Sequence, residues 1–236
     1  MIRITDIQNF PHINLGDNLP SIIVNALKES EFFPEEHDVF CVASKIVSFS
    51  EKRFVNLSTV TPGELALKIH EQAQNKDPRT IQLIIDATGD PSGKRLNVSG
   101  NFIGGWLPCG LYLTSAGIDK IDSENVMLLP KDPDESAKKI GAKIFSEFGV
   151  NAGVIITDSD GRQDKIGATQ IAVGVYGVPA LRESYYGGKK MQETICDMLA
   201  AAGGLIMGQR GTGKPVVIIR GFEYEFNPDA KIGDAL

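Results

Sequence analysis

Two carboxylates and a hydroxyl follow directly on an apolar stretch in the second half of the chain. Residues 153–157 are short, apolar and rich in β-branched side chains, as in a strand buried on both faces, and Asp158, Ser159 and Asp160 come next. Oxygen ligands of this kind bind hard cations such as Mg²⁺ and Mn²⁺, usually together with substrate phosphate. The pattern predicts a metal site at the end of a strand. The alternative is an ordinary polar turn, because Asp and Gly are the commonest turn residues.

A second acid occupies a comparable position. Residues 111–114 are expected to form a strand, and Asp119 follows shortly after it. Two acids that lie just past the carboxyl ends of strands, here Asp119 and Asp158, would form a divalent-metal site if they converge on one cavity. Ser159 and Gln209 offer neutral oxygens that would complete it. We therefore expect Asp119 and Asp158 to carry the catalytic chemistry.

A glycine-rich segment near the carboxyl end resembles a phosphate-binding loop. Residues 208–214, Gly-Gln-Arg-Gly-Thr-Gly-Lys, match the first seven positions of G-x-x-x-x-G-K, but the eighth is Pro215 instead of Ser or Thr. The segment also follows a predicted helix and precedes a strand, the reverse of the P-loop order, so we exclude a Walker motif. Free amides and two cations suit a phosphate cradle. The alternative is a helix C-cap followed by a turn.

Composition limits the possible partners and compartments. The 236 residues are 42% hydrophobic, enough for a sizeable core in one large domain or in two interlocked lobes. A net charge of −6 without a basic stripe argues against nucleic acid as the main partner. Three scattered cysteines, no apparent signal peptide and no membrane-length apolar stretch predict a reduced, cytoplasmic protein that does not enter a membrane.

The predicted elements alternate irregularly and include hairpins, which favours an α+β fold over a doubly wound sheet. Asp77-Pro78 and Asp132-Pro133 are typical helix starts, and Thr61–Glu64 matches a capping box. Ser44 and Lys45 fall inside an otherwise apolar predicted strand, where the lysine either extends its amine outward or points at a phosphate. The predicted strands are 2–10, 38–47, 111–114, 154–157, 168–176 and 215–219, and the predicted helices begin near 19, 62, 78, 133 and 190.

Four segments occur together in the order found in one enzyme family. They are Ser115-Ala116-Gly117-Ile118-Asp119, Leu128-Leu129-Pro130 with Asp132-Pro133-Asp134 and Ser136-Ala137, Gly153 to Arg162, and Met207-Gly208 with Pro215 to Gly221. The series resembles the γ-glutamyl ligases that add glutamate to the deazaflavin coenzyme precursor F420-0, in register from about residue 2 to 222. The 115–119 and 153–158 segments together are specific for this family, and either alone would be weak.

The resemblance implies a mixed α/β fold with antiparallel sheets, assembled as an intertwined homodimer. It also implies GTP or ATP as co-substrate, two Mg²⁺ or Mn²⁺ ions, and K⁺ as an optional further ion. Asp119, Asp158, Ser159 and Gln209 would be the metal ligands. The nucleotide site would be lined by Phe10, Pro11, His12, Ile13, Ser44, Lys45, Asn125, Met207, Gly208, Arg210, Gly211, Thr212, Gly213 and Lys214.

Several positions depart from the family pattern. Phe49 stands where the family usually has a lysine, and Ser115 replaces an asparagine. Two extra residues separate Asp119 from Asn125, and Asp164-Lys165 replaces an expected aromatic-arginine pair. The metal acids are retained, while the residues around them differ.

Three functions are compatible with these features. The favoured one is a nucleotide-driven amide ligase that forms an acyl phosphate, which the glutamate amine then attacks. The second is a nucleotide- or metabolite-binding paralogue with little catalysis, which Phe49 makes plausible. The third is a metal-dependent phosphohydrolase, which would release phosphate without an amine.

The segment 181–190 bears on the acceptor. It is several residues shorter than in the family and contains Arg182, Lys189, Lys190 and the pair Tyr185-Tyr186. A basic, aromatic segment suits an anionic acceptor with a flat ring and a glutamyl carboxylate. It therefore predicts an acceptor other than the deazaflavin precursor, with folate the first candidate. The alternative is that the loop changed length without a change of substrate.

Overall fold

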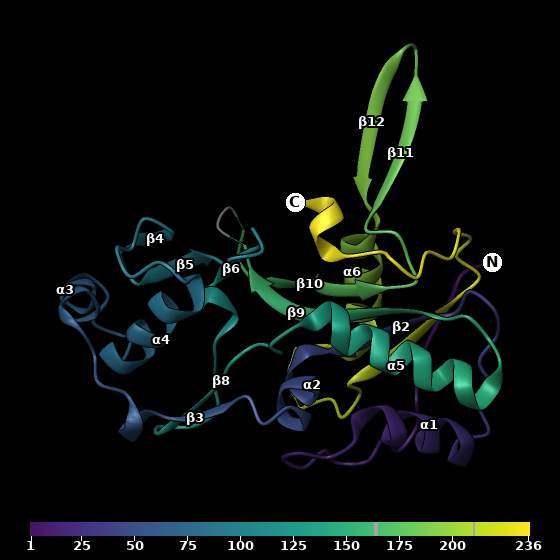
Figure 1. The fold of residues 1–236 in the computed structure, drawn as a ribbon, viewed down its shortest axis with the longest axis horizontal. Helices are drawn as coiled ribbons and strands as arrows, with labels where there is room; N and C mark the ends of the chain where they lie inside the picture. The colour runs from purple at the N-terminus through teal and green to yellow at the C-terminus, as the bar shows by residue number, and fades with distance from the viewer. Residues whose placement is uncertain (163–164, 210) are drawn as a thin grey trace. The chain divides into compact units, whose positions relative to one another are not determined.

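The chain forms two compact units, the first of which is discontinuous in sequence. The computed structural model describes residues 1–162, 165–209 and 211–236. Unit 1 comprises Met1–Lys52 and Pro130–Leu236, and unit 2 comprises Arg53–Leu129 (Figure 1). Unit 2 is thus inserted between the two sequence halves of unit 1.

Unit 1 is built on a mixed five-stranded sheet. Its strand order is β1 (Arg3–Asp6), β13 (Val216–Arg220), β2 (Val39–Ala43), β9 (Gly153–Gly161) and β10 (Ala168–Tyr176). The pair β2–β9 is parallel and the other neighbours are antiparallel. The two central strands are apolar and buried, as expected for strands that are covered on both faces.

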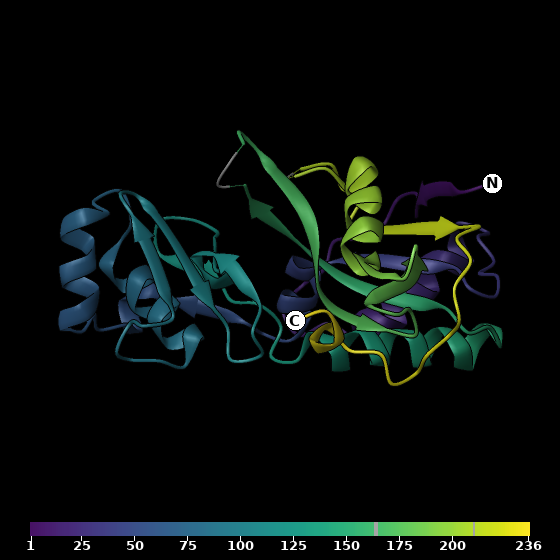
Figure 2. The same cartoon turned by 90° about the horizontal axis from the view of Figure 1, so that it is seen from above.

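Helices cover both faces of this sheet. Helix α6 (Ile195–Met207) lies on one face, and α1 (Leu19–Glu29) and α5 (Pro133–Phe148) lie on the other (Figures 1 and 2). The close approach of α6 requires a glycine: a Cβ on Gly203 would lie 2.9 Å from the Cβ of Cys41 on β2. The backbone of α6 therefore packs closely against β2.

Local capping chemistry starts two of the helices as predicted. The side chain of Asp77 accepts a hydrogen bond from the amide of Arg79 at the start of α4 (Pro78–Thr88), and Asp132 accepts one from Glu135 at the start of α5. In both cases proline occupies the first helical position, where its missing N–H costs nothing. The predicted capping box is wrong, because Gly63 occupies the N-cap position of the next helix and has no side chain to cap with.

Unit 2 contains two small antiparallel sheets and two helices around their own apolar cluster. The sheets have the orders β3-β8-β7 and β4-β5-β6. The cluster includes Leu57, Ile81, Ile84, Ile103 and Val126, which are at most 1% exposed. The elements are β3 (Phe54–Asn56), the 3₁₀ turn η1 (Leu57–Thr59), α3 (Glu64–Gln72), α4, β4 (Leu96–Ser99), β5 (Phe102–Trp106), β6 (Tyr112–Thr114), η2 (Ser115–Gly117), β7 (Asp119–Lys120) and β8 (Asn125–Met127).

A two-stranded hairpin projects from the sheet of unit 1 (Figure 1). It consists of β11 (Leu181–Tyr186) and β12 (Lys189–Thr194), and a final 3₁₀ turn, η3 (Ile232–Ala235), ends the chain. Tyr185 and Tyr186 near its tip are 71% and 85% exposed. The hairpin carries these aromatic side chains away from the core of unit 1.

Three predicted boundaries are wrong in ways that matter for the site. The strand predicted over 38–47 ends at Ala43, and α2 (Ser44–Ser50) follows, with Ser44, Val47 and Ser48 buried at helical spacing. The helix predicted from residue 190 begins at Ile195, because 189–194 pair with β11. The strand predicted over 154–157 continues to Gly161 in pairing with β10.

The α+β class with antiparallel sheets is confirmed, and none of the helices in the described ranges is long and apolar enough to cross a membrane.

A buried ion pair joins β13 to the start of β2 and yields a stability prediction. Asp38 is only 1% exposed, and its carboxylate accepts hydrogen bonds from Nε and Nη2 of Arg220 at 2.8 and 2.7 Å. Replacing Arg220 with Ala leaves a buried carboxylate unpaired, so we expect the free energy of unfolding in urea to fall by about 3 kcal/mol. The control is Arg182→Ala, which removes an exposed pair with Glu193 and should leave the urea midpoint unchanged. Equal midpoints for the two variants would contradict the role assigned to Arg220.

Candidate functional site

Most of the site residues predicted from sequence belong to unit 1, and two belong to unit 2. Asp119 and Asn125 lie in unit 2, and the rest lie in unit 1. Arg210, one of the predicted nucleotide contacts, and Asp164, one of the departures from the family pattern, lie outside the described residues.

Three strands of unit 1, β1, β2 and β13, end or begin level with the middle of β9, at one edge of the sheet. Asp6 at the end of β1 pairs with Val217, and Ala43 at the end of β2 pairs with Thr157 of β9. The amide of Ala43 also donates to the carbonyl of Pro215 at 2.9 Å, just before β13 begins. The segments that follow or precede these residues therefore gather at the same edge.

Asp158 is the first residue of β9 beyond its pairing with β2. It lies within β9, not after it, because pairing with β10 continues through Asp158 opposite Ile171. On the β2 side the chain has already turned into α2, and the hydroxyl of Ser44 donates to Oδ1 of Asp158 at 2.8 Å. Two residues that were predicted to belong to the site are thus in direct contact.

Ser159 faces the opposite side of the sheet from Asp158, because successive strand residues alternate. Its hydroxyl accepts a hydrogen bond from Nε2 of Gln170 at 2.8 Å, and the same nitrogen lies 3.4 Å from the carbonyl oxygen of Gly208. Ser159 and Asp158 therefore reach different surroundings. The sequence prediction that both ligate metal stays a prediction.

Gln170 is a site residue that sequence reasoning missed. It is only 7% exposed, lies opposite Ser159 on β10, and ties that strand pair to the segment after α6. Space for it comes from Gly204, where an added Cβ would lie 2.6 Å from Cγ of Gln170. The adjacent glycines 203 and 204 in an apolar helix are the signal that indicates these close contacts.

The segment 207–214 begins as a helix C-cap. Gly208 has φ +65°, and its amide donates to the carbonyl of Gly204 at 2.9 Å, while the hydroxyl of Thr212 donates to the carbonyl of Met207. Lys214 ends the segment with its ammonium 3.4 Å from Oδ2 of Asp6. The helix cap that was the alternative interpretation is present, and a phosphate-binding role for the segment stays a prediction.

The remaining predicted nucleotide contacts of unit 1 differ in exposure. Ile13 is 5% exposed and belongs to the core, whereas Pro11 and His12 are exposed and Phe10 is half-buried in the segment that follows β1. Lys45 is half-buried in the first turn of α2.

Asp119 follows an unusual turn in unit 2. It begins β7, not the position after a strand end, and the preceding residues Ser115, Ala116 and Gly117 have φ of 53°, 50° and 72°. Left-handed backbone in non-glycine residues is strained and persists only where the surroundings hold it. Lys76 supplies one such contact, since its ammonium donates to the hydroxyl of Ser115 at 2.9 Å and burial lowers its pKa.

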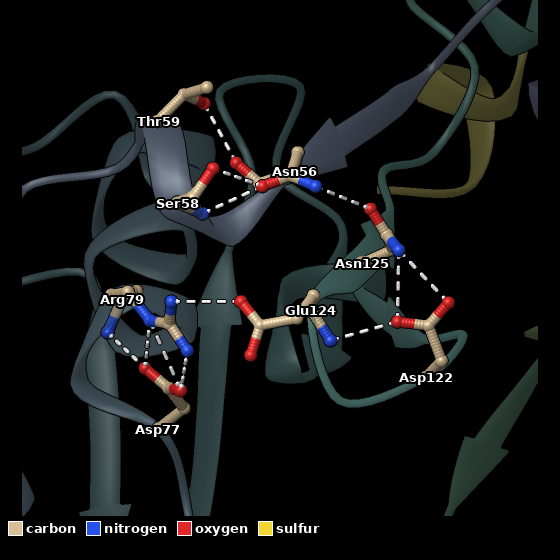
Figure 3. Close-up of polar contacts among 8 residues, drawn as sticks. All are labelled: Asn56, Ser58, Thr59, Asp77, Arg79, Asp122, Glu124 and Asn125. Atoms are coloured by element: carbon tan, nitrogen blue, oxygen red, sulfur yellow. Dashed lines mark hydrogen bonds and ion pairs between the residues drawn. The ribbon is translucent and has the colours of Figure 1, made fainter.

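The side-chain amide of Asn125 lies in a continuous hydrogen-bonded chain (Figure 3). Asn56 donates from Nδ2 to Oδ1 of Asn125 at 3.1 Å, and Asn125 donates from Nδ2 to both carboxylate oxygens of Asp122 at 2.9 Å. The amide of Glu124 also donates to Asp122, at 2.8 Å. Asp122 and Asn56 were not predicted as site residues. Asn56 meets Asn125 only through the β3–β8 pairing, and Asp122 lies in a local turn that carries no recognised motif.

The candidate metal ligands of unit 1 are oxygen atoms, which bind hard cations, and not the thiolates or imidazoles that softer metals prefer. Within the described ranges, His, Cys, Asp and Glu form no group of three or more arranged for a metal ion. Burial raises the pKa of the Cys41 and Cys196 thiols to about 12, so neither is a ready thiolate. Asp158, Ser159 and Gln209 offer only oxygen ligands of the type that Mg²⁺ and Mn²⁺ take, if Gln209 uses its carbonyl. That Asp119 shares a cluster with Asp158 stays a prediction.

Comparison with known proteins gives one consistent result. A family model described as F420-0:Gamma-glutamyl ligase matches residues 8–221. The chain is 36% identical to the coenzyme F420:L-glutamate ligase of Methanosarcina mazei, covering 97% of this chain and 89% of that protein. It is 33% identical to the protein of that name from Methanothermobacter thermautotrophicus, covering 94% and 90%, and 32% identical to that from Halobacterium salinarum, covering 92% and 86%.

The position of Gln170 predicts a local effect on the 207–209 backbone. Gln170→Leu removes the donor to Ser159 and Gly208, so we expect the free energy of unfolding to fall by about 1–2 kcal/mol. Amide hydrogen exchange of residues 207–209 should become faster. The matched control is Gln192→Leu, which removes an exposed bond to Glu183 on the hairpin and should change neither quantity. Unchanged exchange in Gln170→Leu would show that Gln170 does not hold this segment.

Proposed function

The chain belongs to the F420-0:gamma-glutamyl ligase family and is a ligase, and we propose that it joins L-glutamate to a carboxylate of a small anionic acceptor at the expense of GTP. The observation that carries the proposal is the family match over residues 8–221, combined with the convergence of Ser44, Asp158 and the 207–214 segment at one sheet edge. The GTP and metal requirements are part of the proposal.

The proposed reaction has two balanced steps. In the first, a carboxylate oxygen of the acceptor attacks the γ-phosphorus, the bond to the bridging oxygen breaks, and an acyl phosphate and a nucleoside diphosphate form. In the second, the neutral amine of glutamate attacks the acyl carbon, a C–N bond forms, inorganic phosphate leaves, and the amine loses a proton. The product is an amide.

The residues of unit 1 have distinct proposed roles. Asp158 would hold a divalent cation, and Ser44 orients its carboxylate through the 2.8 Å hydrogen bond. When bound, that cation would neutralise charge on the transferred phosphoryl group. Lys45 and Lys214 supply positive charge for the nucleotide phosphates, and Gln170 holds the start of the 207–214 segment in place.

The acceptor we favour is the F420 precursor, because the relatives are named for coenzyme F420. The expectation of folate rested on a basic 181–190 segment. In the structure Arg182 pairs with Glu193 at 2.8 Å and Lys190 with Glu183 at 2.5 Å, so most of that positive charge is balanced. Folate remains the second acceptor to test.

The decisive assay combines GTP or ATP, Mn²⁺, L-glutamate and either acceptor, with mass spectrometry for one added glutamyl unit. We expect glutamylation of the F420 precursor, and we expect Asp158→Asn to lower kcat/KM at least about a hundredfold, because a cation ligand is lost. Asp229→Asn, an exposed acid of the same unit, is the control and should retain activity.

The same assay distinguishes the other functions. Phosphate release without glutamate would indicate a phosphohydrolase, and nucleotide binding without turnover would indicate a non-catalytic paralogue. Glutamylation of folate alone would overturn the choice of acceptor, and full activity of Asp158→Asn would overturn its role.

We also propose a homodimer in which a second copy covers the β11–β12 hairpin. Isolated two-stranded hairpins are marginally stable in water, and this one exposes Tyr185, Tyr186 and Met191, the last by 48%. Light scattering should therefore give twice the chain mass of 25.5 kDa.

The double substitution Tyr185→Glu with Tyr186→Glu should shift the mass toward that of one chain, because charged side chains would have to be buried. Leu67→Glu, at a 48% exposed position on α3 of unit 2, is the control and should leave the mass unchanged. A wild-type mass of 25.5 kDa at micromolar concentration would refute the dimer.

A further inference from the structure

We infer that Asp122 is a positioning residue that fixes the amide of Asn125 so that its carbonyl oxygen receives a hydrogen-bond donor of the nucleotide. The inference rests on the proposed function and on the family resemblance, which implies that Asn125 lines the nucleotide site. It assigns a role to the loop that contains the two extra residues between Asp119 and Asn125. The residues involved are drawn in Figure 3.

At the Asn56 end, the orientation of the side-chain amide is fixed by a backbone donor. The backbone N–H of Ser58 can only donate, and it lies 2.9 Å from Oδ1 of Asn56. The Oδ1 atom of Asn56 is therefore directed at Ser58, and its Nδ2 is directed at Asn125. Because Nδ2 can only donate, the atom of Asn125 that faces Asn56 is the carbonyl oxygen.

The other end is equally restricted. An ionised carboxylate can only accept, so the atom of Asn125 that lies 2.9 Å from both oxygens of Asp122 is the nitrogen. The hydrogen bond from Asn125 lowers the pKa of Asp122, which keeps the carboxylate ionised. Both ends thus select the same orientation of the Asn125 amide, and each bond polarises the next.

This orientation determines what Asn125 offers a ligand. Its nitrogen is engaged by Asp122, whereas its carbonyl oxygen has two lone pairs and Asn56 uses one of them. The remaining lone pair accepts from an N–H or O–H group. In a nucleotide such groups are the ribose hydroxyls and the donors of the base, not the phosphates, which at neutral pH mainly accept.

The charged side chains around Asp122 also favour a neutral part of the nucleotide over a phosphate. Glu124, which follows Asp122 in the loop, pairs with Arg79 at 3.3 Å, and Arg79 also pairs with Asp77 at 2.7 Å. Lys120 adds one more positive charge near Asp122. Three carboxylates against two cations make this a poor position for a phosphate and an acceptable one for a neutral ribose or base.

The chain supplies a matched control for Asp122. Asp90 lies in the same unit and accepts a hydrogen bond from the amide two residues ahead, Ser92, at 2.9 Å, as Asp122 does from Glu124 at 2.8 Å. Asp122 is exposed and Asp90 is half-buried, and among the described residues both accept hydrogen bonds only from those within five positions in sequence, so neither substitution to Ala should unfold the protein. Asp90 also accepts from the hydroxyl of Ser92 and the amide of Arg95, whereas Asp122 also accepts from the side chain of Asn125.

The experiment measures steady-state glutamylation with GTP and with three analogues, 2′-deoxy-GTP, 3′-deoxy-GTP and ITP, which lacks the exocyclic amine. Asp122→Ala should raise the KM for GTP about tenfold, the effect of one lost hydrogen bond, with kcat and the KM for glutamate within about twofold. Asp122→Asn, which keeps an acceptor oxygen, should lie between it and wild type. Asp90→Ala should match wild type.

The analogues test the orientation itself. In wild type, one analogue should raise the KM about tenfold, and in Asp122→Ala the same analogue should raise it less than about twofold, because its partner is no longer fixed. A GTP KM unchanged in Asp122→Ala, or the same analogue penalty in both proteins, would overturn the inference while leaving the proposed function intact. If wild type shows no turnover, calorimetry with GTP decides: tenfold weaker binding by Asp122→Ala supports the inference, and equal or absent binding overturns it.

Discussion

The parallel pairing of β2 with β9 ends at Ala43 and Thr157, and the unit 1 site depends on that ending. Because β2 turns into α2 there while β9 continues beside β10, a helical serine replaces the next strand residue next to Asp158. The central strands before this point are apolar and buried on both faces. A rigid sheet therefore delivers one carboxylate to an edge where three other segments also end or begin.

The two units hold their predicted site residues by different means. In unit 1, close packing positions the residues. Gly203 and Gly204 let α6 approach the sheet closely enough for Gln170 to contact the carbonyl oxygen of Gly208. In unit 2, Asn125 is oriented by hydrogen bonds between partly exposed groups, which contribute little to stability. Variation in this loop of unit 2 can therefore change the orientation of the Asn125 amide without endangering the fold.

The fold class and the helix starts at Asp77 and Asp132 were accessible from sequence, because capping and strand periodicity are local. Ser44 was expected at the site from the family resemblance alone, and its contact with Asp158 was not predicted. The change from strand to helix at Ser44 could not be predicted from local patterns. The segments VFCVA and SKIVS are both apolar enough for a strand, and they differ only in that pairing with β9 stops after Ala43. The strand over 189–194 depends on its partner β11 in the same way. Gln170 and Asp122 carry no motif: the contacts of Gln170 arise from cross-strand pairing with Ser159, and those of Asp122 arise from a local turn.

The insertion of unit 2 into unit 1 has a consequence for how the chain acquires its structure. Ser44 and Asp158, which touch, are 114 residues apart in sequence, so β2 leaves the ribosome long before β9 exists. During that interval residues 53–129 can close their own sheets and cluster, since their contacts are internal. An already folded insert shortens the disordered loop that must be closed when β9 arrives, which reduces the entropic barrier to pairing. Synthesis in this order leaves the apolar strand β2 without its parallel partner until late, the period in which the nascent chain is most prone to aggregation.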